Sequence, residues 1–450
     1  MKKIRFTTTQ IILLSFLLVI FLGSILLALP ISSAGGRAVP YIDALFTATT
    51  STCVTGLVTV PTFSTWSVFG QVVILILIQV GGLGVITVMT GMMLLLNRKL
   101  GVGDRLLIQD AFNLNTLSGL IKFVRNVLFG TLIVEGIGAA VYMLVFVPEF
   151  GPKGIWISVF TSVSAFCNAG IDMIAENSLC NYATDPVINV VTSALIILGG
   201  LGYIVWWDVL RVVKRRSPKD RKMFRYLTLH SKIAITVTAG LILIGAALIF
   251  LFEYANPLTI GEMSLFDKLQ VSFFQSVTTR TAGFATVAQE DLTNASAAVS
   301  VLLMLIGGSP VGTAGGMKTV TIAVLVCSAF ATIRNKRSAT LFGRSLSEDA
   351  IKKAVAVVVM FLGICTAATV LLLATSDASA IDAVYETVSA TATVGLSRNL
   401  TATLNTFGKL IIIATMYFGR VGPISLAVAL GSKNESQNVV SEPTETISIG

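Results

Sequence analysis

A short motif that ends in glycine and a bulky apolar residue occurs four times along this chain. The copies are Val54-Thr55-Gly56-Leu57, Asn168-Ala169-Gly170-Ile171, Thr281-Ala282-Gly283-Phe284 and Thr393-Val394-Gly395-Leu396. Their glycines are 112 to 114 residues apart, and an aromatic residue stands ten positions before each of them: Phe46, Phe160, Phe273 and Tyr385. A constant period is typical of a chain built from repeated structural units. The sequence therefore predicts four copies of one unit.

The composition indicates that these units lie in a membrane. Of the 450 residues, 54% are hydrophobic and 12% are charged, and the mean hydropathy is +0.85. Four soluble domains would need far more polar surface. The net charge of +9 does not indicate nucleic acid, because most Lys and Arg residues lie in four short loops and at the termini. This is the positive-inside pattern, and it predicts cytoplasmic termini and a basic face that could also meet membrane lipids or an acidic partner.

Each unit is predicted to contain a long apolar helix, a short amphipathic segment that ends in the glycine motif, and a second apolar helix. The first helices are expected at 10–29, 123–147, 231–252 and 354–374, the short segments at 41–52, 157–166, 268–279 and 381–391, and the second helices at 66–96, 187–213, 297–333 and 407–430. The short segments cannot cross a bilayer, so their nonhelical ends must line protein or water. The predicted fold is an all-α polytopic membrane protein with eight transmembrane helices and four re-entrant pore helices around a central ion pore.

The repeats are expected at residues 1–97, 98–213, 214–333 and 334–431, with a polar cytoplasmic tail at 432–450. A continuous helix over 297–333 would measure about 55 Å, against an apolar layer of about 30 Å. We therefore predict that this helix is interrupted by a loop over 307–318. Its residues include Gly307, Gly308, Ser309, Pro310, Val311, Gly312, Thr313, Ala314, Gly315, Gly316 and Lys318. Milder glycine clusters occur at 81–84, 199–202 and 419–422.

Backbone carbonyls explain why glycine recurs in the motif. Carbonyl oxygens can replace the hydration shell of a monovalent cation, and glycine permits the backbone angles that aim them inward. The expected ligands of the cation are carbonyls of Val54, Thr55, Gly56, Asn168, Ala169, Gly170, Thr281, Ala282, Gly283, Thr393, Val394 and Gly395. We expect no enzyme activity and no cofactor, because the sequence has no catalytic triad, paired-carboxylate site or zinc-ligand spacing.

Two basic residues fall inside predicted membrane segments, where a cation is costly and usually functional. Arg420 lies near the middle of the last helix, and we predict hydrogen bonds from it to carbonyls of the 307–318 loop or of the glycine motifs. Glu135 is a candidate counter-charge for Arg420, or it could face a dimer partner. Lys318 could act as part of the 307–318 loop or simply reach the cytoplasmic interface.

On these residues the sequence resembles Ktr-type potassium-uptake channel subunits, in the superfamily that also contains Trk-type bacterial and HKT-type plant transporters. The resemblance covers essentially the whole chain: the four glycine motifs, the 307–318 loop, Phe418-Gly419-Arg420-Val421-Gly422-Pro423 and the helix start at Leu229-His230. Trk-type subunits usually carry two extra N-terminal helices, whereas this chain begins with its first repeat. The Ktr branch is therefore favoured.

The resemblance implies a homodimer in a prokaryotic plasma membrane, with one pore per subunit, on a cytoplasmic ring of nucleotide-binding regulatory subunits that opens the 307–318 gate. HKT-type relatives that prefer sodium often have serine at the position of Gly56, so glycine implies a preference for K+. Whether Na+ is an activator stays open, as does the nucleotide that the partner senses. Two alternatives remain: a Na+-translocating or Na+/K+-coupled transporter of the same superfamily, and a non-conducting membrane scaffold.

Overall fold

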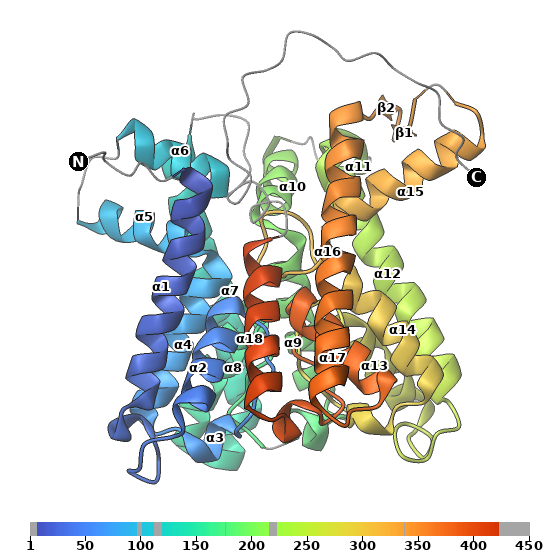
Figure 1. Ribbon diagram of the computed structural model, residues 1–450. Coiled ribbons are helices and arrows are strands. Elements are labelled where there is room, and N and C mark those ends of the chain that lie inside the picture. The colour runs from blue at the N-terminus through green and yellow to red at the C-terminus, as the bar shows by residue number, and fades with distance from the viewer. Residues whose placement is uncertain are drawn as a thin grey trace.

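The computed structural model describes residues 7–96, 101–111, 119–175, 177–215, 223–336 and 338–422, and these residues are mostly helical (Figure 1). The predicted tail at 432–450 lies outside them. A small hairpin of β1 (Thr340–Leu341) and β2 (Arg344–Ser345) joins α15 to α16. In Figure 1, the hairpin, α5, α6, α10 and α11 gather at one end of the molecule, and α3 lies at the opposite end.

Each of the four predicted repeats contains one long helix. These helices are α1 (Thr8–Ala28), α7 (Leu120–Phe150), α12 (Leu229–Glu253) and α16 (Glu348–Thr375). Each is long and apolar enough to cross a membrane. Side chains of Thr7, Thr228 and Ser347 accept hydrogen bonds from first-turn N–H groups and so fix where α1, α12 and α16 begin. The first helices therefore lie within a few residues of the predicted ranges.

A short helix follows each long helix and packs against it. These are α2 (Tyr41–Cys53), α8 (Lys153–Phe166), α13 (Leu265–Thr278) and α17 (Ala380–Ala392), and each ends just before a glycine motif. Three of the aligned aromatics, Phe46, Phe160 and Tyr385, are fully buried. The third repeat differs, because Phe273 is 37% exposed and its neighbour Phe274 is buried instead.

The second helices are broken in the first three predicted repeats, and the fourth, predicted at 407–430, is described only as far as residue 422. They are α4 (Val68–Leu83) with α5 (Val85–Leu95), α9 (Pro186–Leu201) with α10 (Tyr203–Arg215), α14 (Asn294–Leu305) with α15 (Thr319–Ile333), and α18 (Thr406–Val421). The predicted continuous helices over 66–96 and 187–213 are wrong, since the chain bends by 98° after α4 and by 95° after α9. Gly84 and Gly202 form these bends with φ near +85°, a conformation that side-chain-bearing residues rarely adopt.

By length and composition, the described residues contain four helices that could span a membrane, or six when each bent pair is taken as one span. The break predicted in the third repeat is present, because α14 ends at Leu305 and α15 begins at Thr319. Short connecting elements complete the chain: η1 (Pro30–Ser32), α3 (Thr62–Thr65), α6 (Val102–Ala111), η2 (Cys180–Tyr182), α11 (Met223–Tyr226), η3 (Gln289–Asp291) and η4 (Thr401–Thr403).

Candidate ion pathway

The four glycine motifs adopt one backbone shape. We call residues 54–56, 168–170, 281–283 and 393–395 the glycine loops. The first residue of each is left-handed, with φ of 56° at Val54, 59° at Asn168, 66° at Thr281 and 52° at Thr393. The glycine that ends each loop also has a positive φ, between 63° and 104°. Recurrence of an uncommon conformation at four non-glycine residues indicates that the repeats share a local structure as well as a sequence pattern.

Hydrogen bonds to the preceding short helix orient the loop peptides. In the first repeat, the N–H groups of Thr55 and Gly56 donate to the backbone oxygen and the hydroxyl of Thr50, at 2.8 and 3.0 Å. In the fourth repeat, Val394 and Gly395 donate in the same way to Ser389. The N–H and C=O of a trans peptide group point in opposite directions. The carbonyls before these N–H groups, among them those of Val54 and Thr55, therefore point away from the short helices.

The second and third loops follow the same rule with small differences. Ala169 donates to the Ser164 carbonyl, and Ile171 donates to the Ser164 hydroxyl at 3.0 Å. In the third repeat the donor is Ala282 and the acceptor is the Thr278 carbonyl. All four loops thus bind their own helix through N–H groups, which leaves carbonyls as the polar groups directed away from it.

The four glycine loops meet in a closed cycle, which we call the glycine ring. A Cβ atom placed on any of the four glycines would collide with the carbonyl oxygen of the middle residue of the next loop. These contacts run from Gly56 to Ala169, from Gly170 to Ala282, from Gly283 to Val394 and from Gly395 to Thr55. Glycine is therefore required both by its φ angle and by the approach of a neighbouring backbone.

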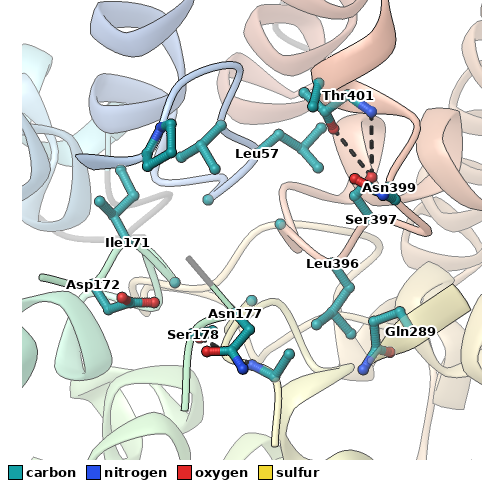
Figure 2. A pocket seen from close by; sticks show the side chains of 18 of the residues that line it. Leu57, Ile171, Asp172, Asn177, Ser178, Gln289, Leu396, Ser397, Asn399 and Thr401 are labelled. Atoms are coloured by element: carbon teal, nitrogen blue, oxygen red, sulfur yellow. Dashed lines mark hydrogen bonds between the residues drawn. The ribbon is translucent and has the colours of Figure 1, made fainter. Parts of the chain in front are cut away.

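A cavity of about 400 Å³ opens on the side of the ring that follows the glycines. Figure 2 shows Asp172, Asn177 and Gln289 beside it, together with the apolar residues Leu57 and Leu396 that follow two of the glycines. Among the described residues its lining includes the acids Asp172 and Glu290 and no Lys or Arg. A cation thus meets an electronegative mouth here. Burial raises the pKa of Asp172 to about 6, although hydrogen bonds from Ser178 and from the Ile174 and Ala175 N–H groups oppose this shift.

Loop 307–318 is closed at its base by backbone hydrogen bonds. Gly307 donates to the Met317 carbonyl at 2.9 Å, Met317 donates to Leu305 at 3.2 Å, and Thr319 donates to Gly308 at 3.1 Å. We call this closed base the neck and residues 309–316 the body of the loop. The neck brings the ends of α14 and α15 together, so the loop is a compact insertion.

The loop body packs against the second repeat. Ser309 donates to the Gly200 carbonyl at 2.8 Å, and Tyr203 donates to Val311 at 2.9 Å, on either side of the bend at Gly202. The Thr313 hydroxyl lies 3.0 Å from the Phe166 carbonyl and 2.9 Å from Oδ1 of Asn168. The body thereby touches a residue of the glycine ring. On the fourth repeat, Gly315 lies so close to Thr393 that a Cβ atom at this position would collide with it.

A second cavity, of about 350 Å³, is lined by the loop body, by the bend at Gly84 and by both basic residues singled out in the sequence. Arg420 donates to the carbonyls of Thr313 at 2.6 Å, Gly81 at 2.5 Å and Gly82 at 3.4 Å. Lys318 donates to Ala314 at 2.7 Å, within its own loop. Its ammonium therefore lies beside the cavity and is bonded within the loop.

Glu135 does not pair with Arg420. It is 5% exposed, accepts a hydrogen bond from Gln79 at 3.1 Å and lies 3.7 Å from the Cys167 thiol. The only ion pairs among the described residues are Asp208–Arg211, Asp382–Arg398 and Asp43–Lys409. Glu135 is therefore not the counter-charge of Arg420, which uses carbonyls as partners, and it is buried among residues of its own chain.

One buried basic residue was missed in the sequence. Arg280, directly before the third glycine loop, is 5% exposed and contacts Gly307 in the neck. The position of Arg280 within its repeat could have identified it. Arg280 stands three residues before Gly283, and the residues at this position in the other repeats are small: Cys53, Cys167 and Ala392. A charged residue in this otherwise small position pointed to a partner behind the ring.

The chain is similar in sequence to known cation transport proteins. Residues 3–442 match the family described as "TrkH: Cation transport protein". The chain is 38% identical to the potassium/sodium uptake protein NtpJ of Enterococcus hirae, over 99% of this chain and 98% of that protein. It is 39% identical to the Ktr system potassium uptake protein B of Bacillus subtilis, over 97% and 96% of the two chains.

A solved structure supports the fold. The potassium transporter TrkH from Vibrio parahaemolyticus superposes with a TM-score of 0.76 at 16% identity, over 95% of this chain and 86% of that one. The resemblance to Ktr and Trk proteins is thereby confirmed, and this is a family of transporters and channels rather than of enzymes. The chain belongs to the TrkH family of cation transport proteins.

Proposed function

We propose that this protein is the ion-conducting subunit of a potassium uptake system, in which the glycine ring selects dehydrated K+ through backbone carbonyls. The observation that carries the proposal is the closed cycle of contacts among Gly56, Gly170, Gly283 and Gly395. Loops that bind their own helices through N–H groups direct carbonyls elsewhere, and a ring of carbonyls is the chemistry of potassium filters. The four helix–pore loop–helix repeats then surround one axis.

Loop 307–318 is the proposed gate. It lies between the glycine ring and the second cavity, and its body is bonded to Asn168, Gly200 and Arg420 at the same time. A loop with several separate attachments can be released in one step when enough of them break. The end of the molecule that holds α5, α10 and the hairpin is proposed to be cytoplasmic, in agreement with the distribution of Lys and Arg.

The proposal includes a prokaryotic plasma membrane, a homodimer and a cytoplasmic nucleotide-binding regulatory subunit that releases the gate. Names of relatives that refer to a "Ktr system" support more than one component. The driving force is electrochemical, since an inside-negative potential of 100 mV contributes about 2.3 kcal/mol per cation. The test of assembly is co-purification with such a subunit and a rise in flux when it and its nucleotide are added.

Sodium transport is the second candidate, because the Enterococcus relative is named a potassium/sodium uptake protein. Purified protein in liposomes with a K+ gradient should take up rubidium, and K+ should compete far better than Na+. Equal competition by Na+ would favour the sodium reading. Absence of flux that persists after residues 311–316 are deleted would favour the scaffold, whereas flux that appears on deletion would identify the gate.

A further inference from the structure

Arg280 places a guanidinium behind the glycine ring, at a position where the other three repeats have a small residue. Cys53, Cys167 and Ala392 are fully buried at this position, three residues before the glycine, and Arg280 replaces them in the third repeat. The next three residues of the chain form the third glycine loop. A movement of Arg280 is therefore transmitted over a single peptide bond to Thr281.

The Arg280 side chain reaches the neck of loop 307–318. Its Nη2 donates to the Gly307 carbonyl at 3.0 Å and lies 3.4 Å from Thr238 Oγ1 on α12. The N–H of Gly307 is bonded to Met317 across the neck. Gly307 is thus bonded to two residues: its N–H donates to Met317 on the other side of the neck, and its carbonyl accepts from Arg280.

Arg280 has no carboxylate partner among the described residues. A void of about 10 Å³, room for one water molecule, lies beside it and is lined by Ile196, Ile197, Gly200, Val277 and Gly308 among others. Nη1 has no hydrogen-bond partner in the protein. Burying an unpaired charge is strongly unfavourable, so its few hydrogen bonds carry much of the compensation. The contact with Gly307 is therefore central to how this side chain is accommodated.

The other contacts between the loop and the ring involve the body. Thr313 meets Asn168, and Gly315 packs on Thr393. These contacts are lost when the body moves, whereas the neck is closed by its own hydrogen bonds and can stay in place. Arg280 is therefore positioned to hold the third glycine loop while the body is displaced.

We propose that Arg280 is a positioning residue that fixes the third glycine loop to the neck of loop 307–318 and thereby maintains the preference of the ring for K+ over Na+. The inference rests on the proposed role of the ring as a filter. It predicts that ion preference depends on Arg280 both when the gate is closed and when the gate body is absent.

The test compares Arg280→Met, Arg280→Gln and Arg280→Lys in the full chain and in a chain lacking residues 311–316. Met keeps length but cannot donate, Gln keeps a neutral donor, and Lys keeps the charge without the planar fork. Exposed Arg37 provides the matched control, Arg37→Met. Two readouts are measured: competition of K+ and Na+ for rubidium uptake into liposomes, and the rise in melting temperature that each cation produces, which requires no flux.

Arg280→Met should reduce the preference for K+ over Na+ by about tenfold in both backgrounds. Lys and Gln should give intermediate values, and they keep the test valid if Met does not fold. A wild-type chain that prefers K+ together with Arg280 variants that retain the full preference would overturn the inference alone. A wild-type chain with no K+ preference in either readout would overturn the proposed filter, and the inference with it.

Discussion

The Thr313 hydroxyl lies 2.9 Å from the Asn168 side chain, although 145 residues separate the two in sequence. This hydroxyl also lies 3.0 Å from the Phe166 carbonyl, but it has only one hydrogen to donate. Asn168 Nδ2 is otherwise without a partner. Rotating the amide by 180° lets Nδ2 donate to Thr313 while Thr313 donates to the Phe166 carbonyl, and Oδ1 then takes the position without a partner. The pair therefore connects the proposed gate directly to the proposed filter.

Thr313→Val should loosen this connection without changing the size of the side chain. Losing one or two hydrogen bonds worth about 1 kcal/mol each should raise the open fraction and the rubidium flux of the isolated protein by roughly fivefold to thirtyfold. Thr403→Val, at an exposed threonine that bonds only within its own turn, serves as the control. Flux at or below the wild-type level would argue that the Thr313 contact does not hold the gate closed.

Gly56→Ser should raise Na+ permeation relative to K+. Its Cβ atom would collide with the Ala169 carbonyl, and φ at Gly56 is 104°, so one wall of the ring must shift. The measurement is the permeability ratio from competition for rubidium uptake. Gly36→Ser is the control, because Gly36 also has a positive φ but has no atom near its Cβ position. An unchanged ratio in Gly56→Ser would count against the assigned filter.

Arg420→Ala should destabilise the protein and alter gating together. It removes the donors to Thr313, Gly81 and Gly82 and leaves buried carbonyls unpaired. We expect a loss of roughly 3 kcal/mol, seen as a lower melting temperature in detergent, and higher flux without a partner subunit. Arg37→Ala, at an exposed arginine, should change neither. If Arg420→Ala has the stability and the flux of the wild-type protein, Arg420 neither stabilises the protein nor holds the proposed gate closed.

Cation entry should strengthen as the external pH rises through 6. Burial raises the pKa of Asp172 from 3.8 to about 6, so its carboxyl is neutral below this pH and negative above it. The Asp172 carboxylate lines the cavity of about 400 Å³ beside the glycine ring, which is also lined by Glu290 and Cys180. We expect the apparent KM for rubidium uptake to fall about threefold between pH 5 and pH 7.

Asp172→Asn should remove most of this pH dependence, whereas Asp377→Asn, at an exposed acid, should retain it. Retention in Asp172→Asn would assign the effect to another group. Stability should respond in the opposite direction. The folded protein binds the Asp172 proton more tightly than the unfolded chain does, so the contribution of this group to stability falls as pH rises from 3.8 to about 6.

The sequence predicted the parts of the fold that depend on local pattern. The four glycine motifs located the C-terminal ends of α2, α8, α13 and α17 within one residue, because each of these helices ends just before its motif. The length of the third repeat required a break, and the glycine-rich stretch at 307–316 located it. These features are encoded within a few tens of residues.

Contacts between repeats could not be predicted in the same way. The bend at Gly202 is bonded on both sides by the loop body, through Ser309 and Val311, and these residues lie more than 100 positions further along the chain. Arg420 was expected to bond to carbonyls, but Gly81 is 339 residues away, and no local signal identifies it. Glu135 was a candidate counter-charge for Arg420 because the two residues carry opposite charges, whereas the fold places Gln79 beside it.

The cyclic contacts among the four glycines occur within one polypeptide. In an assembly of four identical subunits, a substitution at the axis appears on all sides at once. Here Asn168 and Arg280 each occur in one quarter only, so the sides of the axis differ in chemistry. A blocking molecule that enters such a passage has one preferred rotational orientation rather than four equivalent ones, and it loses correspondingly more rotational entropy when it binds.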